Sequence, residues 1–226
     1  MFLDKDLNFE KHISTKVNKA NSMFGVIRRN FHYLDRKTFI PLYKALVRTH
    51  LDYASSVYSP SKMMHIDKIE SVQRRATKQL PGMKDLTYPE RLRLLKLPTL
   101  SYRRVRGDMI ELYKITHDIY DKRVCQMVKL QKDCLSRTST RGNSFRIQHT
   151  RAATNVRKNA FTVRTAPIWN SLPDYVVTAV TINSFKNRLD KHWEMQEMVY
   201  DNYKASIDTF PRSHIKLKLG SPVERT

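Results

Sequence analysis

The chain has 226 residues, and its 42 lysines and arginines against 21 aspartates and glutamates give a formal net charge of +21. Because so large an excess repels itself unless an anion offsets it, we expect nucleic acid as the partner and anionic lipid as its main rival. No apolar run approaches the ~18 residues of a membrane span and the charged N-terminus is unlike a secretory signal, so the sequence predicts an intracellular protein, nuclear or cytoplasmic, with no membrane span.

Two amphipathic helices are predicted at the N-terminus. Apolar residues recur every three or four positions from Phe9 to Arg29, which indicates a helix of about 30 Å at a rise of ~1.5 Å per residue, with Asn8 as its cap. Asp35 is the expected cap of the second helix, and Pro41 is expected to kink its first turns. Four side chains of this second helix should face the core: Phe39, Leu42, Leu46 and Val47.

Three more helices are predicted before residue 121. The third ends at the breaker pair Pro81-Gly82, and the fourth is a short helix that opens on a capping box of Thr87 and Glu90 and stops near Pro98. Thr99 opens the fifth helix, whose first turns are crowded with arginines. These cations oppose the helix dipole, and phosphates or solvent would offset the resulting energetic penalty. The expected core stripes of the third and fifth helices are Ile66, Ile69, Val72, Ala76 and Leu80, and Val105, Met109, Leu112, Ile115 and Ile119.

The texture of the sequence changes after Asp121. Residues 136–154 are rich in Ser, Thr, Arg and Asn and have no helical stripe, which is typical of a loop or a weak strand. Phe145–Ile147 and Phe161–Val163 alternate over a few residues, so we expect two short strands that pair. Thr181 is the expected cap of a last helix, and a polar tail follows from Tyr200. The apolar stripe of that helix is Ile182, Phe185, Leu189 and Trp193.

Five segments then carry a common pattern. They are Leu42–Ala54 (LYKALVRTHLDYA), Asp67–Ala76 (DKIESVQRRA), Leu112–Ile115 (LYKI), Ile168–Pro173 (IWNSLP) and Ser184–Trp193 (SFKNRLDKHW). Each is weak alone, but their order and spacing are similar to the region that follows the palm in LINE-type, non-LTR retrotransposon reverse transcriptases of the jockey and RTE kind. The resemblance extends from Leu3 to about Trp193.

The resemblance implies a chain that does not polymerise. The palm of such enzymes carries its catalytic carboxylates in a Phe/Tyr-Ala-Asp-Asp box that holds two metal ions. This sequence contains no Asp-Asp pair, and Leu3 to Phe9 resembles the stretch just past the palm. We therefore expect no enzyme activity and no cofactor, and neither the palm nor the family's endonuclease within the chain.

The resemblance also implies a thumb, whose helices rest on the backbone of template and primer, whether RNA, DNA or hybrid duplex. The predicted fold class is mainly α: a basic helical bundle similar to a polymerase thumb, followed by a small α+β or irregular C-terminal appendage. The expected divisions are a thumb-like domain over 1–121, a basic linker with weak strands over 122–160, a helical appendage over 161–195 and a polar tail over 196–226.

Basic side chains on the predicted polar faces are the candidate phosphate contacts, because thumb contacts need shape and positive charge more than base-edge chemistry. The alternative is that these cations only keep the helices soluble. The candidate nucleic-acid-binding residues are Lys16, Lys19, Arg28, Arg29, Arg74, Arg75, Lys78, Arg103, Arg104 and Arg106.

Two other kinds of site were weighed against simple packing. Zinc binding by Cys125, Cys134, His117 and His149 is disfavoured, because no close pair of ligands occurs among them. Trp169 and Trp193 are expected as core anchors of the C-terminal appendage. Five tyrosines could stack on bases, although helical packing explains them equally well. They are Tyr53, Tyr58, Tyr102, Tyr113 and Tyr120.

Three hypotheses about function remain open at this point. The leading one is a non-catalytic fragment of a reverse transcriptase that binds template and primer through its basic helices. The second is an inert or protein-interacting remnant of a truncated element, which would expose the apolar face that normally packs on a palm. In the third, the chain works with a separate reverse transcriptase palm, or belongs to a longer polymerase.

Overall fold

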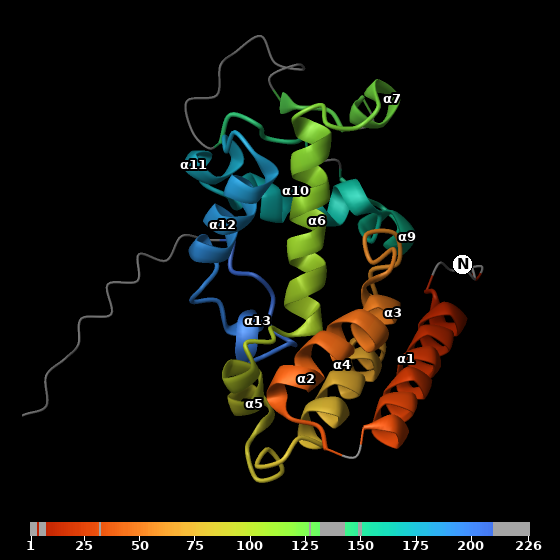
Figure 1. Ribbon diagram of the computed structural model, residues 1–226. Helices are drawn as coiled ribbons and strands as arrows, with labels where there is room; N and C mark the ends of the chain where they lie inside the picture. The colour runs from red at the N-terminus through yellow and green to blue at the C-terminus, as the bar shows by residue number, and fades with distance from the viewer. Residues whose placement is uncertain are drawn as a thin grey trace, which may run out of the picture.

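The computed structural model describes residues 4, 8–31, 33–126, 128–131, 143–148 and 151–209, and it confirms the predicted mainly α fold class (Figure 1). Within these residues, the β contact is an isolated antiparallel bridge between Leu130 and Ile147. The helices are α1 (Glu10–Asn30), α2 (Arg36–Leu42), the π-helix η1 (Tyr43–Arg48), α3 (Thr49–Asp52), α4 (Met63–Lys78), α5 (Tyr88–Leu95), α6 (Leu100–Thr116), α7 (Lys122–Cys125), α9 (Asn155–Lys158), α10 (Phe161–Ser171), α11 (Asp174–Val177), α12 (Ile182–His192) and α13 (Glu197–Tyr200).

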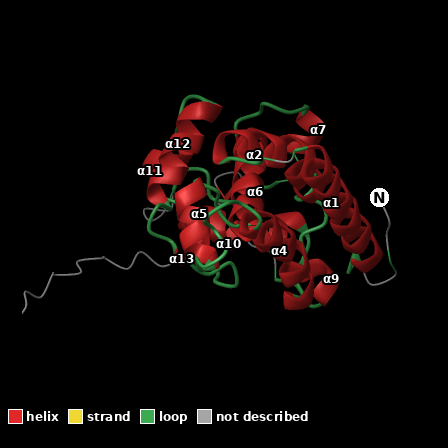
Figure 2. Ribbon diagram, turned by 60° about the horizontal axis from the view of Figure 1, so that its bottom comes forward, coloured by secondary structure: helices red, strands yellow, loops and turns green. Residues whose placement is uncertain are grey.

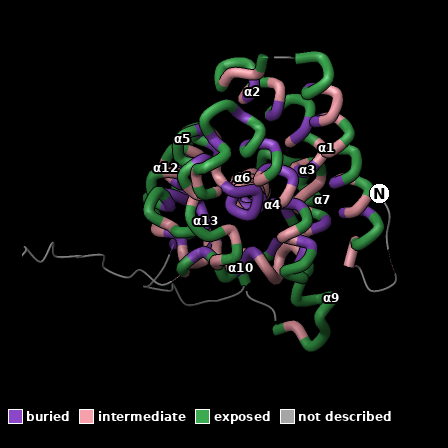
Figure 3. Tube along the Cα trace, turned by 90° about the horizontal axis from the view of Figure 1, so that it is seen from below, coloured by how far each residue is buried: buried purple, intermediate pink, exposed green. Residues whose placement is uncertain are grey.

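Helix α6 is the central column of the molecule. It contacts α3 and α4 of the N-terminal bundle and also α10 and α12 of the C-terminal half (Figures 1 and 2). Seen along its axis, α6 lies at the centre of the fold and is mostly buried (Figure 3). Helix α6 therefore packs against both halves of the chain.

Two hydrophobic cores divide at the start of α6. The first gathers buried residues from Ile13 to Leu100, and the second gathers buried residues from Tyr102 to Ile207. Met109 and Leu112 of α6 are fully buried in the second core. The predicted domain boundary at Asp121 stays a prediction, although α6 packs with the C-terminal core.

The first predicted helix is present, but its cap is not Asn8. The side chain of Asp4 accepts hydrogen bonds from the backbone N–H groups of Asn8 at 2.6 Å and Glu10 at 3.1 Å. Phe9, the residue that precedes α1, has a left-handed backbone with φ 56°. The cap comes from a carboxylate upstream because this turn brings the chain back over the helix N-terminus.

Side-chain caps begin several helices, as predicted. Asp35 accepts from the backbone N–H of Thr38 at 2.8 Å, and Thr87 and Glu90 form the capping box of α5. Thr99 and Thr181 likewise accept from backbone N–H groups in the first turns of α6 and α12. These caps satisfy donors that have no partner inside a helix.

The second predicted helix contains a π-helical segment that changes which side chains are buried. Pro41 lies inside α2, and the π-helix η1 begins directly after the last residue of α2. A π turn holds more residues than an α turn and rotates the later side chains about the axis. Tyr43 and Val47 are consequently fully buried, whereas Leu46, which was predicted to face the core, is 36% exposed.

The predicted strand Phe161–Val163 is wrong, because Phe161 is the first residue of α10. Three alternating residues are outweighed by the helical spacing that buries Thr165, Ala166 and Trp169. Ile147 forms its bridge with Leu130 instead. Both tryptophans are core anchors, as predicted: Trp169 is 0% exposed and Trp193 is 1% exposed.

The predicted polar tail is partly incorporated in the second core. Met198, Val199 and Ile207 are buried, and the Tyr203 hydroxyl donates to an Asp67 carboxylate oxygen at 2.5 Å. The expectation of a polar tail from residue 196 is therefore wrong up to residue 209, and the remainder of that tail lies outside the described residues.

A buried carboxylate fixes the start of α6. Glu70 of α4 is 0% exposed and accepts from the Leu100 backbone N–H at 3.0 Å and from the Tyr88 hydroxyl at 2.6 Å. Burial raises the pKa of Glu70, and the Tyr88 hydrogen bond and the nearby Arg104 guanidinium oppose that rise. The Glu70 carboxylate is thus a hydrogen-bond acceptor at the N-terminus of α6. It is also a counter-charge for the Arg104 guanidinium.

Replacement of Glu70 by alanine should destabilise the protein by about 3–5 kcal/mol, because it leaves Arg104 as an uncompensated buried charge. Urea unfolding followed by circular dichroism measures this loss. Glu90→Ala, which removes an exposed carboxylate from the capping box of α5, is the matched control and should lower stability less. Equal losses in the two variants would show that Glu70 does not link the halves.

His12 should make stability depend on pH. Its ring is 3% exposed, packs edge-on against Tyr58 at 4.7 Å between centroids, and has an Nε2 atom with no hydrogen-bond partner among the described residues. Burial, together with the charge of Lys16, lowers the pKa of His12. The unfolded chain, with a histidine pKa of about 6.5, therefore binds this proton first as the pH falls.

The contribution of neutral, buried His12 to the free energy of unfolding is complete above pH 6.5. It is lost as the pH decreases toward the folded pKa of His12. His12→Gln should lose less free energy of unfolding between pH 7.5 and pH 5.5 than the wild type loses. Urea titrations at the two pH values measure the difference. The same pH dependence in both proteins would contradict it.

Candidate functional site

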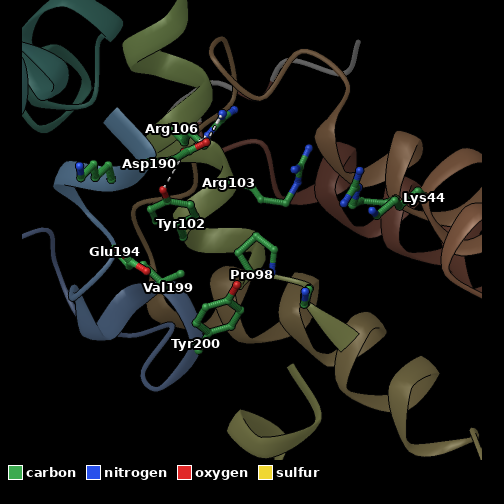
Figure 4. Close-up of a pocket in the computed structure, with 12 residues that line it drawn as sticks. Lys44, Pro98, Tyr102, Arg103, Arg106, Asp190, Glu194, Val199 and Tyr200 are labelled. Carbon is green, nitrogen blue, oxygen red and sulfur yellow. Dashed lines mark hydrogen bonds and ion pairs between the residues drawn. The ribbon is translucent and has the colours of Figure 1, made fainter. Parts of the chain in front are cut away.

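A cleft of about 610 Å³ lies where η1, the first turns of α6, and α12 and α13 meet (Figure 4). Pro98, Tyr102 and Tyr200 contribute to its wall. Its charged residues are mostly cationic: Lys44, Arg48, Lys96, Arg103, Arg106 and Lys191 against Asp190 and Glu194. The cleft therefore concentrates positive charge on a concave surface that both cores help to form.

Local backbone geometry places these cations. Lys44 and Arg48 lie on the same segment η1. Arg103 and Arg106 are three residues apart on α6 and so project from neighbouring positions of one face. Lys96 ends α5 in the left-handed conformation, with φ 51°, which turns the chain toward α6 and leaves its side chain exposed.

Two aspartates hold the arginines of the cleft. Asp52 of α3 accepts from Arg103 at 2.8 Å and lies 3.6 Å from the Arg48 guanidinium. Asp190 of α12 accepts from Arg106 Nη2 at 2.7 Å. The hydrogen bond that Arg106 donates to Asp190 is the main cause of a raised pKa for Arg106, so this guanidinium stays charged.

The lysines of the cleft are held less tightly. Lys44, Lys96 and Lys191 are exposed, and none forms a salt bridge within the part of the chain that the structure describes. Flexible ammonium groups beside fixed guanidinium groups suit a ligand with several anionic oxygens. The arrangement therefore provides an anion-binding surface.

Arg103 and Arg106 are the predicted site residues that line the cleft. The prediction for Arg104, which lies between them in sequence, is wrong in placing it on a polar face. Arg104 is 5% exposed, and burial lowers its pKa while Tyr58 and Glu70 act in the opposite direction. Two of its guanidinium nitrogens, Nε and Nη2, are buried without a hydrogen-bond partner among the described residues.

Arg74 is also engaged inside the protein. Its guanidinium lies 5.4 Å from the centroid of the Tyr88 ring and 5.2 Å from that of Tyr203, and it donates to the Tyr203 hydroxyl at 2.7 Å. These contacts attach the segment after α13 to α4. Arg74 is half-buried and contributes to packing, and its role as a nucleic-acid contact stays a prediction.

The remaining predicted cations lie on the N-terminal bundle, away from the cleft. Lys16 lies 4.8 Å from the Tyr53 ring centroid, and Arg75 of α4 donates to Asn21 of α1 at 3.0 Å. Four more are exposed: Lys19, Arg28, Arg29 and Lys78. The ten predicted residues thus do not share one concave surface.

Four cations of the cleft were missed by the sequence analysis: Lys44, Arg48, Lys96 and Lys191. Lys44 and Arg48 had a usable signal, because they are spaced by four residues on a predicted helix. Lys96 follows a helix end and Lys191 belongs to a distant helix, so nothing in the sequence linked them to the arginines of α6.

Most of the tyrosines considered for base stacking are packing residues. Tyr58, Tyr102 and Tyr113 are at most 4% exposed, so the stacking hypothesis is wrong for these three. Tyr53 and Tyr120 are 67% and 38% exposed. Stacking on these two stays a prediction.

The described residues contain no group of three or more His, Cys, Asp or Glu side chains suited to hold a metal ion. Cys134 and His149 of the zinc hypothesis lie outside them. His117 stacks with Tyr113 at 4.0 Å and with Phe145 at 4.4 Å between ring centroids. A search of the same described helices for a long apolar stretch finds none that could cross a membrane.

Comparison with known proteins does not assign a family. No family model matches the sequence, and no solved structure matches it. An uncharacterized protein of Caenorhabditis elegans, B0403.1, is 25% identical over 122 residues, which are 53% of this chain and 60% of that protein. The chain thus spans less than two thirds of the length of this relative.

Proposed function

We propose that this chain is a non-catalytic nucleic-acid-binding protein whose cationic cleft contacts the phosphate backbone. The observation that carries the proposal is the convergence of six basic side chains on one concave surface. A phosphate backbone presents anionic oxygens at regular spacing and is bound mainly through positive charge. The shape of the cleft and its charge therefore fit this ligand without base-specific contacts.

The ion pairs of the cleft support phosphate binding. Asp52 and Asp190 hold the guanidinium groups of Arg103 and Arg106 in fixed positions, so these groups need little ordering when a ligand arrives. The lysines carry no such partner in the described part of the chain. They are the side chains that a polyanion would order, with release of bound counterions.

The resemblance to LINE-type reverse transcriptases adds support from the sequence. Segment Leu42–Ala54 supplies Lys44 and Arg48 to the cleft, and segment Ser184–Trp193 supplies Asp190 and Lys191. Two segments that carry the resemblance, far apart in sequence, thus meet at one site. We accordingly propose a thumb-like role, with the Asp-Asp box required for polymerisation not present in this sequence.

Neutralising the lysines of the cleft should weaken binding and flatten its dependence on salt. The variant is Lys44→Ala/Lys96→Ala/Lys191→Ala, and the probe is a fluorescein-labelled RNA–DNA hybrid. If each lysine neutralises one phosphate, the slope of log affinity against log salt should decrease by roughly 2–3. Fluorescence anisotropy at a series of ionic strengths measures this slope.

A control removes the same charge from elsewhere on the surface: Lys62→Ala/Lys84→Ala/Lys122→Ala, which changes three exposed lysines outside the cleft. The control should retain most of the slope. If both triple variants bind alike, the charge of the whole surface binds the probe and the cleft is not the site. No binding by the wild type at low salt would refute nucleic-acid binding altogether.

Removing an acid from the cleft should have the opposite effect. Asp190→Asn leaves an acceptor for Arg106 but removes the negative charge, so affinity for the hybrid should rise and the salt slope should increase by up to roughly 0.9. Asp85→Asn, at an exposed aspartate outside the cleft, is the matched control. Weaker binding by Asp190→Asn would show that the ion pair itself is needed to position Arg106.

A further inference from the structure

A second concave surface lies among the start of α1, the α3–α4 connection, α7, α9 and the start of α10. Helices α7 and α9 lie on the other side of α6 from α12 and α13, which line the cationic cleft (Figure 1). It is a groove of about 810 Å³. Its apolar lining residues include Phe9, Val57, Ile115, Val124, Val156 and Phe161. The cationic cleft and this groove have no lining residue in common.

The groove gathers side chains that the fold leaves in contact with water. Val57 is 63% exposed, Val156 is 46% exposed and Val124 is 40% exposed, and they come from three separate segments. Single exposed apolar residues are ordinary, but several that converge on one groove mark an interaction surface. Such a surface gains free energy when an apolar partner covers it.

Positive charge accompanies the apolar lining. Arg157 of α9 lines the groove, and the exposed cations Lys122, Arg123 and Lys158 belong to α7 and α9, the helices that supply Val124 and Val156 to it. None of these four cations forms a salt bridge within the described residues. Glu111, the acid in the lining, is already paired with Lys114 at 2.9 Å. Cations therefore flank an apolar floor whose own carboxylate is neutralised.

We propose that this groove binds an amphipathic helix of a partner protein, with an apolar ridge flanked by aspartate and glutamate. In helix-in-groove complexes, apolar side chains that recur every three or four residues of the bound helix pack into an apolar groove. The lysines and arginines of α7 and α9 attract the acidic residues on the flanks of the partner helix. A nucleic-acid backbone would leave the floor uncovered. Because cleft and groove lie on different sides of α6, one chain can bind both partners at once.

The test uses a fluorescein-labelled synthetic helical peptide with leucine at positions i, i+3, i+4 and i+7 and glutamate at the flanking positions. Its control peptide has lysine in place of each glutamate. The full chain should bind the glutamate peptide at least tenfold more tightly than the lysine peptide, measured by fluorescence anisotropy. Equal affinities for the two peptides would overturn the proposal that the partner helix is acidic.

Variants locate the binding. Val57→Gln/Val124→Gln/Val156→Gln changes three exposed positions of the groove and should weaken glutamate-peptide binding at least tenfold. Val180→Gln changes a valine that is 91% exposed and outside the groove, and it should bind as the wild type does. Circular dichroism checks that both variants retain the wild-type helix content. Unchanged binding by the triple variant would refute the groove as the site.

Two other occupants are distinguished in the same series. Concentration-dependent dimerisation in sedimentation experiments, abolished by the triple variant, would assign the groove to a second copy of the chain and overturn the proposal. Tight binding to anionic phosphatidylserine vesicles, lost in the triple variant, would assign it to a lipid surface with the same consequence. Neither result depends on nucleic-acid binding, so failure here leaves the cationic cleft untouched.

Discussion

Glu70 joins the two halves of the molecule through the polar contacts that its buried carboxylate makes. Its oxygens accept from the Leu100 backbone N–H at the start of α6 and from the Tyr88 hydroxyl; burial raises the pKa of Glu70, and the nearby Arg104 guanidinium opposes that rise. An ionised carboxylate is stable away from water only where such partners surround it. The position of α6, and with it everything packed along α6, therefore depends on this contact.

The same logic explains how so few acids organise so basic a chain. Several aspartates lie where one helix meets another and hold an arginine there: Asp52 joins α3 to α6, Asp190 joins α12 to α6, and Asp108 joins α6 to α10 through Arg164. The arginines thus mostly bind the protein to itself. The exposed lysines of the cleft, Lys44, Lys96 and Lys191, are not held in this way within the described residues.

What could be predicted from the sequence was local. In the caps at Asp35, Thr87 and Thr181, the side chain and its backbone partner are three positions apart, so the sequence spacing was enough to predict each cap. Arg104 shows the limit, because its burial depends on tertiary packing: the groups that act on its pKa, Tyr58 and Glu70, lie on segments distant in sequence. Phe161 was assigned to a strand because three residues of alternation cannot be distinguished from the start of a helix.

The lining of the cleft is assembled from residues that lie far apart in the sequence. Lys44 and Arg48 come from the first bundle, whereas Asp190 and Lys191 come from a helix packed on the second core. Each half therefore supplies one wall of the concave cationic surface. The buried contact between α4 and the start of α6 sets how these walls face each other. Part of a charge excess spread over the whole sequence is thereby gathered on one concave surface, and the same packing that surrounds Glu70 positions the walls of the cleft.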